Sequence, residues 1–192
     1  SVLEIGCGTG YYTNKISKYA KKVIGIDYEQ SYLDTAKINN VNKNITYLKA
    51  DISKNIIKNK NFDYIFMIDF FLFLFDHKFQ KNLFSKKKLI FKKINKLLKI
   101  NGKLIIVDPH LFWLIPHFGN KTNPFGIITE YNIKHFSTIP TIEQVSNLFY
   151  KTGFVIEKIS EPKLISKIKD IDEITKNFYI QFPPWIVYEL KK

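Results

Sequence analysis

The chain contains no arginine, and this absence qualifies its strong positive charge. All 30 basic residues among its 192 are lysine, and the formal net charge is +13. Arginine is the side chain that best recognises phosphate groups and guanine through paired hydrogen bonds. Because isoleucine and asparagine are abundant too, the lysine content indicates a compositional bias and not a surface selected for nucleic acid. We therefore expect no nucleic-acid partner.

Cysteine and long apolar runs are also scarce. The single cysteine, Cys7, excludes an internal disulfide framework and favours a reducing compartment, so we expect a cytoplasmic protein. The longest uncharged stretches, such as 109–120, are too short for a helix that crosses a membrane. The chain starts at Ser1 and enters an apolar segment at once, so we expect that further residues precede it.

Short apolar stretches alternate with amphipathic ones along most of the chain, which is typical of βαβ units. We expect one domain over residues 1–192, with an α/β fold. Its core would be a Rossmann-like, doubly wound, mostly parallel seven-stranded sheet with helices on both faces. Two late strands without an intervening helix predict one antiparallel strand near the C-terminus. The predicted strands are 2–5, 23–26, 45–48, 62–68, 103–107, 154–160 and 185–190, and the predicted helices are 11–21, 30–38, 86–100 and 141–152.

Residues 109–140 interrupt this alternation. They hold four of the seven prolines and three of the four histidines. We interpret them as a loop-rich insertion that recognises the substrate. Their aromatic side chains suggest a small apolar or aromatic molecule: Phe112, Trp113, Phe118, Phe125, Tyr131 and Phe136.

The sequence LEIGCGTG at residues 3–10 places three glycines directly after the first predicted strand. Glycines there let the main chain approach a ligand closely. The spacing Gly6-x-Gly8-x-Gly10 differs from the G-x-G-x-x-G of pyrophosphate binders. Glu4 would be poorly placed beside a phosphate, but it suits a ligand with an ammonium or sulfonium charge.

Acidic residues follow the next two predicted strands. Asp27 can accept two hydrogen bonds from a ribose diol, and Asp51 can accept one from the exocyclic amine of adenine. Tyr28 would cover the adenine ring, and Ile52 would pack below it. The ligand so described has an amino-acid part, a ribose and an adenine but no phosphate, and S-adenosylmethionine fits this description.

Five ordered segments and two closing strands resemble a class I S-adenosylmethionine-dependent methyltransferase. LEIGCGTG resembles the glycine motif of this family, VIGIDYE (23–29) its acidic second motif and YLKADI (47–52) its third. FDYIFMIDFFLFLFD (62–76) and LLKINGKLIIVDP (97–109) resemble the segments around the fourth and fifth strands. FVIEKISEP and WIVYELKK resemble the last two strands. We therefore expect a methyltransferase with S-adenosyl-L-methionine as its cofactor.

The resemblance implies roles by position. Ile68 and Asp69 would contact the methionine end of the cofactor, largely through backbone groups. Two departures stand out: the helices that usually precede the first strand are missing, and Leu72 and Phe73 stand where many relatives have Glu-His. The cofactor-binding residues so expected are Glu4, Gly6, Cys7, Gly8, Asp27, Tyr28, Asp51, Ile52, Ile68 and Asp69.

Several of these residues have simpler interpretations. Asp27 and Asp69 would each suit a helix cap, and Asp51 would suit a turn. Glu4 would also suit a solvated strand position. Cys7 lies inside the glycine loop, so it suits a small packed residue better than a nucleophile.

His110 follows the fifth predicted strand, at the edge that faces the cofactor. It would take a proton from a hydroxyl or amine acceptor, although a hydrogen-bonded loop histidine has the same sequence. We expect no metal site, because no paired ligand motif occurs.

Three other functions remain open. The first is a methyltransferase that acts on RNA or protein instead of a small-molecule acceptor. The second is a nicotinamide dehydrogenase, against which the glycine spacing and Glu4 argue. The third is a non-catalytic module that binds S-adenosylmethionine.

Overall fold

The structure is a computed structural model that describes every residue except 55–56, 58–60, 76–80, 111–139 and 164–172. None of the described helices has the length and apolar character that a membrane span requires. The elements are β1 (Val2–Ile5), α1 (Tyr11–Ser17), β2 (Val23–Asp27), α2 (Gln30–Asn39), β3 (Ile45–Lys49), β4 (Phe62–Ile68), the 3-10 helix η1 (Phe71–Leu74), α3 (Lys81–Leu97), β5 (Leu98–Pro109), α4 (Ile142–Tyr150), β6 (Val155–Ser160), α5 (Glu173–Gln181) and β7 (Trp185–Lys191).

The strands form one sheet in the order β3-β2-β1-β4-β5-β7-β6. Neighbouring strands are parallel, except that β7 is antiparallel to both β5 and β6. This confirms the predicted α/β fold with one antiparallel strand near the C-terminus. The strand order reverses between β1 and β4. In open α/β sheets, ligands bind at the carboxyl ends of the strands beside such a reversal.

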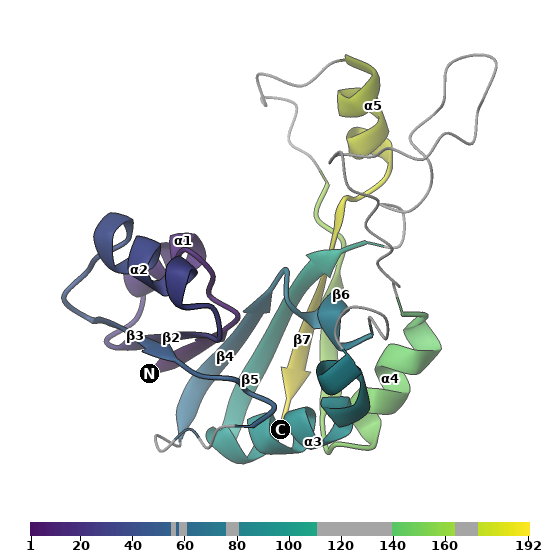
Figure 1. Ribbon diagram of the computed structural model, residues 1–192. Coiled ribbons are helices and arrows are strands. Elements are labelled where there is room, and N and C mark those ends of the chain that lie inside the picture. The colour runs from purple at the N-terminus through teal and green to yellow at the C-terminus, as the bar shows by residue number, and fades with distance from the viewer. Residues whose placement is uncertain (55–56, 58–60, 76–80, 111–139, 164–172) are drawn as a thin grey trace.

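Side chains of β1 show that helices cover both faces of the sheet. Glu4 points to the face of α1, because Thr13 of that helix donates a hydrogen bond to its carboxylate. The adjacent Leu3 and Ile5 point the other way, into a core that includes Ile90 of α3. Figure 1 shows α1 and α2 beside β1–β3, and α3 and α4 beside the other half of the sheet.

Aromatic side chains fix the segment that follows β4. Phe71 of η1 is 1% exposed. Its ring centroid lies 5.7 Å from those of Phe91 and Phe149 and 6.4 Å from that of Tyr188. These contacts hold η1 in the core, so the loop between β4 and η1 has little freedom next to the carboxyl end of β1.

Several predicted boundaries are wrong. α1 ends at Ser17 and α3 at Leu97, both before their predicted ends at 21 and 100. Asn101 and Gly102 do not stop a helix but lie inside β5, where the register with β4 shifts and Asn101 has a φ of 66°. The positive φ of Asn101 therefore accommodates the irregular pairing of β5 with β4. α5 and η1 were not predicted, and most of the predicted insertion 109–140 lies outside the described residues.

Candidate active site

The three glycines of the loop after β1 all have positive φ, but their surroundings differ. A Cβ at Gly6 would lie 2.3 Å from a ring carbon of Phe70, and one at Gly10 would lie 2.4 Å from Tyr47 Oη. At Gly8, by contrast, a Cβ would meet no atom within 4 Å. Gly6 and Gly10 are therefore required for close packing, whereas Gly8 presents open backbone at the carboxyl edge of the sheet.

Asp27 at the end of β2 holds this loop. Its Oδ2 accepts a hydrogen bond of 2.9 Å from the Gly8 N–H, and its Oδ1 accepts one of 2.9 Å from the Glu29 N–H. The residue that caps α2 is Glu29 and not Asp27. Each carboxylate oxygen of Asp27 has a second lone pair, so a diol can bind there without displacing the backbone donors.

Glu4 is a buried acid and not a solvated strand residue. It is 1% exposed, and its partner is the Thr13 hydroxyl. Burial raises the pKa of Glu4 to about 7, with a smaller contribution from the negative charge of Asp27, while the hydrogen bond from Thr13 opposes the shift. A cation bound at the loop would favour the ionised form of Glu4 through the field, because little of its surface remains for direct contact.

The three residues expected around the adenine differ in their burial and in their partners. Asp51 Oδ1 accepts a hydrogen bond of 2.8 Å from the Ser53 N–H, as the turn interpretation expects. Burial alone would raise the pKa of Asp51, but the hydrogen bonds of Ser53 and the ammonium of Lys54 outweigh it and lower the pKa. Ile52 is 4% exposed within the core, whereas Tyr28 is 59% exposed.

Cys7 is packed inside the loop. It is 6% exposed, and its Sγ lies 3.0 Å from the position of a Cβ on Gly25. Burial raises the pKa of the Cys7 thiol far above its usual range, and the charges of Glu4 and Asp27 add to the shift. A thiol held neutral in this way is a packing residue and a poor nucleophile.

Two acids lie at the ends of β4 and β5. Asp69 has a φ of 54°, and its N–H donates to the Val107 carbonyl at 2.9 Å. Asp69 is exposed, but the surrounding protein still desolvates part of the carboxylate and raises the pKa of Asp69 to about 6. Asp69 does not cap η1, since the residue in the cap position is Phe70.

The second acid, Asp108, is 4% exposed and received no role in the sequence analysis. Burial and the charge of Asp69 raise its pKa well above the usual range, although backbone hydrogen bonds from Phe70, Phe71 and Leu72 oppose the shift. Among the described residues its Oδ1 finds no hydrogen-bond partner. Asp108 therefore lies beside the backbone at the start of η1, in the segment where Phe70 packs against Gly6.

His110 lies just beyond β5 and is 6% exposed. Its Nε2 is 2.8 Å from Glu161 Oε1, and its backbone N–H donates to the Pro184 carbonyl at 2.9 Å. Glu161 was not singled out in the sequence, because it follows β6 and is far from His110 along the chain. A carboxylate in this position orients the imidazole ring.

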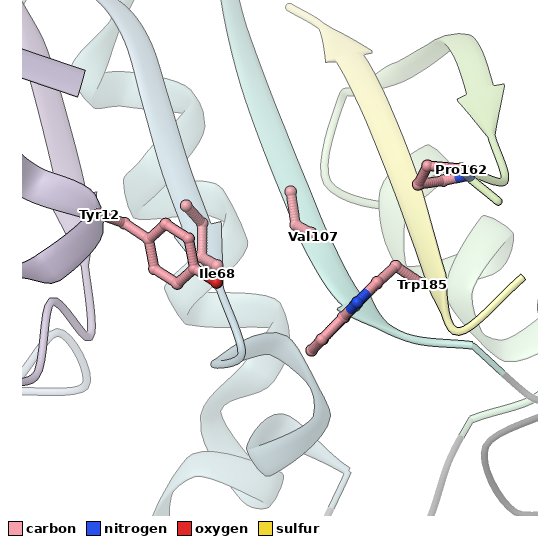
Figure 2. A pocket seen from close by; sticks show the side chains of 5 residues that line it. All are labelled: Tyr12, Ile68, Val107, Pro162 and Trp185. Carbon is pink, nitrogen blue, oxygen red and sulfur yellow. The ribbon is translucent and has the colours of Figure 1, made fainter. Parts of the chain in front are cut away.

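A pocket of about 230 Å³ opens at the same edge of the sheet, and Figure 2 shows its lining. Ile68 of β4 and Val107 of β5 are register partners and form its floor. Sequence reasoning named only Ile68. The position of Tyr12 directly after the glycine loop could have indicated it from the sequence. Val107, Pro162 and Trp185 are distant from that loop in sequence, and only the fold brings them to the pocket. The lining residues are Tyr12, Ile68, Val107, Pro162 and Trp185.

Within the described residues, no group of three His, Cys, Asp or Glu side chains is placed to hold a metal ion. The open backbone at Gly8, the spare lone pairs of Asp27 and the buried acid Glu4 fit the adenosyl and methionine parts of S-adenosylmethionine. No feature of this loop requires a phosphate.

Comparisons with known proteins agree with this fit. The chain matches a family model described as a methyltransferase domain over residues 1–153. It is 22% identical over 200 residues to an uncharacterized methyltransferase of Schizosaccharomyces pombe, with 96% of this chain and 72% of that protein covered. It is 32% identical over 175 residues to a putative methyltransferase of Invertebrate iridescent virus 6, with 82% and 60% covered.

The fold also matches solved structures. The structure of an S-adenosylmethionine dependent methyltransferase from Mesorhizobium loti is similar with a TM-score of 0.70 at 16% identity. The alignment covers 100% of this chain and 90% of that chain. Since the family model spans most of the sequence, the chain belongs to the methyltransferase-domain family and is an S-adenosylmethionine-dependent methyltransferase.

Proposed function

We propose that this methyltransferase acts on a small molecule with an apolar or aromatic body. The observation that carries the proposal is the pocket beside the glycine loop. Its volume is about 230 Å³, and its described lining is mainly apolar side chains. A pocket of this size with an apolar lining suits a small acceptor.

The cofactor would lie along the carboxyl ends of β1, β2 and β3. When bound, S-adenosylmethionine supplies a methyl group on a positively charged sulfur, which is already activated for displacement. The protein then has to hold the acceptor in line and exclude water. The residues proposed for the cofactor are Glu4, Gly6, Cys7, Gly8, Asp27, Tyr28, Asp51 and Ile52, together with Ile68 and Asp69, which would contact it largely through backbone groups and leave their side chains to the pocket.

His110 is the proposed proton acceptor. Its Nε2–H donates a hydrogen bond to the Glu161 carboxylate, which fixes the ring, and its backbone N–H donates to the Pro184 carbonyl. An oriented imidazole is a suitable base for an acceptor that is protonated at neutral pH. We also propose that residues 1–192 form one domain, that 109–140 recognise the substrate, and that the protein is cytoplasmic.

Titration of S-adenosylhomocysteine into the chain tests the cofactor residues. The wild type should bind it, and Asp27→Ala should weaken binding at least about tenfold, because hydrogen bonds to a charged group contribute roughly 1.5–3 kcal/mol. Asp34→Ala on α2 is the control, since the partner of that exposed carboxylate among the described residues is Gln30. Unchanged binding in Asp27→Ala, or displacement by NADH, would contradict the proposal.

A transfer assay tests the acceptor class. The chain and labelled cofactor are incubated in turn with small-molecule, RNA and protein fractions. We expect S-adenosylhomocysteine to form with small molecules, and Trp185→Ala to slow the transfer while leaving cofactor affinity nearly unchanged. Transfer to RNA or protein alone would refute the assignment.

A further inference from the structure

The pocket in Figure 2 has an aromatic side chain on each of two sides. Tyr12 comes from the first turn of α1, and Trp185 is the first residue of β7. The floor residues Ile68 and Val107 lie between them. Tyr12 is 42% exposed, so its ring is available to a ligand. A ligand that rests on this floor is therefore flanked by two π-systems.

An acidic residue without an ion-pair partner among the described residues lies next to the pocket floor. Asp69 directly follows the floor residue Ile68, and the hydrogen bond from its N–H to Val107 keeps it at the junction of β4 and β5. Among the described residues, no cationic group forms an ion pair with Asp69. Its charge is close enough to raise the pKa of the Tyr12 phenol, after the larger effect of burial.

The surroundings of Asp69 are more acidic than the protein as a whole. Asp108 lies near enough for the charge of Asp69 to raise its pKa, and Glu4 contributes to the raised pKa of Tyr12. None of the five lining residues is basic, although the chain carries a net charge of +13. The negative charge of Asp69 beside a lining without basic residues attracts cations and repels anions.

Aromatic rings and a carboxylate together recognise nitrogen. Ring faces attract a positive charge, and a carboxylate accepts strong hydrogen bonds from positively charged N–H groups. We propose that the acceptor of this methyltransferase is an amine, with its nitrogen held between Tyr12 and Trp185 and hydrogen-bonded to Asp69. This inference rests on the proposed function, because it names the acceptor class of the same pocket.

Methyl transfer to the amine moves one methyl group and one positive charge from sulfur to nitrogen. The bound ammonium first gives one proton to His110, the proposed base, which leaves a lone pair on nitrogen. This lone pair forms the new N–C bond while the S–C bond breaks, and the electron pair of that bond stays on sulfur. The positive charge passes from sulfur to nitrogen, so the product leaves as a methylammonium. Asp69 accepts an N–H hydrogen bond, which orients the lone pair and stabilises the charge that nitrogen gains.

Two probes of matched shape separate an amine from a hydroxyl. 2-Phenylethylamine and 2-phenylethanol are each titrated by calorimetry into the chain saturated with S-adenosylhomocysteine. We expect the amine to bind at least about tenfold more tightly, as one charge-assisted hydrogen bond provides. Asp69→Asn should lose most of this preference, since it removes the charge but tolerates the same positive φ. Asp34→Asn should retain it.

Each contrary result overturns a different part of the argument. Equal affinity for the two probes, or no binding of either at millimolar concentration, would overturn the amine proposal. Retention of the full preference in Asp69→Asn, with melting temperature unchanged, would overturn the role of Asp69. Failure of S-adenosylhomocysteine itself to bind would reject the proposed function, and this result is seen before either probe is added.

Discussion

Gly8 and Gly10 lie two residues apart, but substitution by alanine should have different effects at the two positions. Gly8 has a φ of 51° and faces open space, so Gly8→Ala should fold, with a strain of roughly 1–2 kcal/mol. Its new methyl group would occupy the surface assigned to the cofactor. We expect at least about tenfold weaker binding of S-adenosylhomocysteine by calorimetry, which is about 1.4 kcal/mol.

Gly10→Ala is the matched comparison. Its Cβ would lie 2.4 Å from Tyr47 Oη and 2.9 Å from Ala36 Cβ, and φ is 81°. Overpacking adds roughly 1–3 kcal/mol to the backbone strain, so urea unfolding should show a larger loss than in Gly8→Ala. If Gly8→Ala bound the ligand like the wild type, the open backbone at Gly8 would not be the cofactor surface.

The burial of Glu4 makes stability depend on pH. Its folded pKa is about 7 against an ordinary value of 4.5. The folded state therefore binds the proton more tightly, and the stability this provides is present below pH 4.5 and is lost as pH rises through 7. The whole effect is at most about 3 kcal/mol, at 1.36 kcal/mol per pKa unit.

Glu4→Gln isolates this effect, because a neutral amide does not titrate while Asp69 and Asp108 remain in both proteins. Urea unfolding at pH 5 and pH 8 should show that the wild type loses more stability over this interval than the variant. Parallel losses in the two proteins would mean that Glu4 does not titrate with a raised pKa.

At the scale of elements, apolar patterning predicted all seven strands. β1 and β2 are buried on both faces, so apolar residues occupy every position of β1 except Glu4 and every position of β2 before Asp27. The end of α3 was not predicted, because Leu98 and Ile100 continue the apolar pattern of the helix. Their strand conformation depends on pairing with β4, and Leu98 is the register partner of Phe62. Such long-range pairing has no local signal.

The residues of the candidate site also fall into those that the sequence predicted and those that depend on long-range pairing. Glu4, Gly8 and Asp27 were found from the sequence, since each stands at a fixed offset from a strand end. The partner of His110 and the pocket wall at Trp185 come from β6 and β7, which only the sheet order brings beside β5. Where geometry depends on chain segments distant in sequence, motifs along one strand and its loop do not contain it.

The start of α4 gives a prediction for one element. Thr141 Oγ1 accepts from the Gln144 N–H, and the Gln144 side chain accepts from the Thr141 N–H, which is a capping box. Thr141→Ala should reduce the free energy of unfolding by about 1 kcal/mol, measured in urea. Ser146→Ala, within the same helix, should be nearly neutral. An equal loss in both variants would contradict the capping role.

At the scale of the whole molecule, the positive charge is concentrated in one region. Ten of the 30 lysines and no acidic residue lie between Asp76 and Asp108. On α3, four exposed lysines recur at helical spacing along one side, over roughly 22 Å at 1.5 Å per residue. No ion pair with them is found in the described part of the chain. They are Lys81, Lys88, Lys92 and Lys96.

This stripe allows the small-molecule and RNA functions to be separated. Binding through four lysines would release about three counterions from single-stranded RNA. We therefore expect the chain to bind an RNA column at low salt and to elute near physiological salt. Replacing the four lysines by glutamine should abolish this binding, while S-adenosylhomocysteine binding and transfer to small molecules stay unchanged, because α3 and the pocket lie on opposite faces of the sheet. RNA binding that survives physiological salt and is weakened by Trp185→Ala would instead connect RNA to the pocket and favour an RNA methyltransferase.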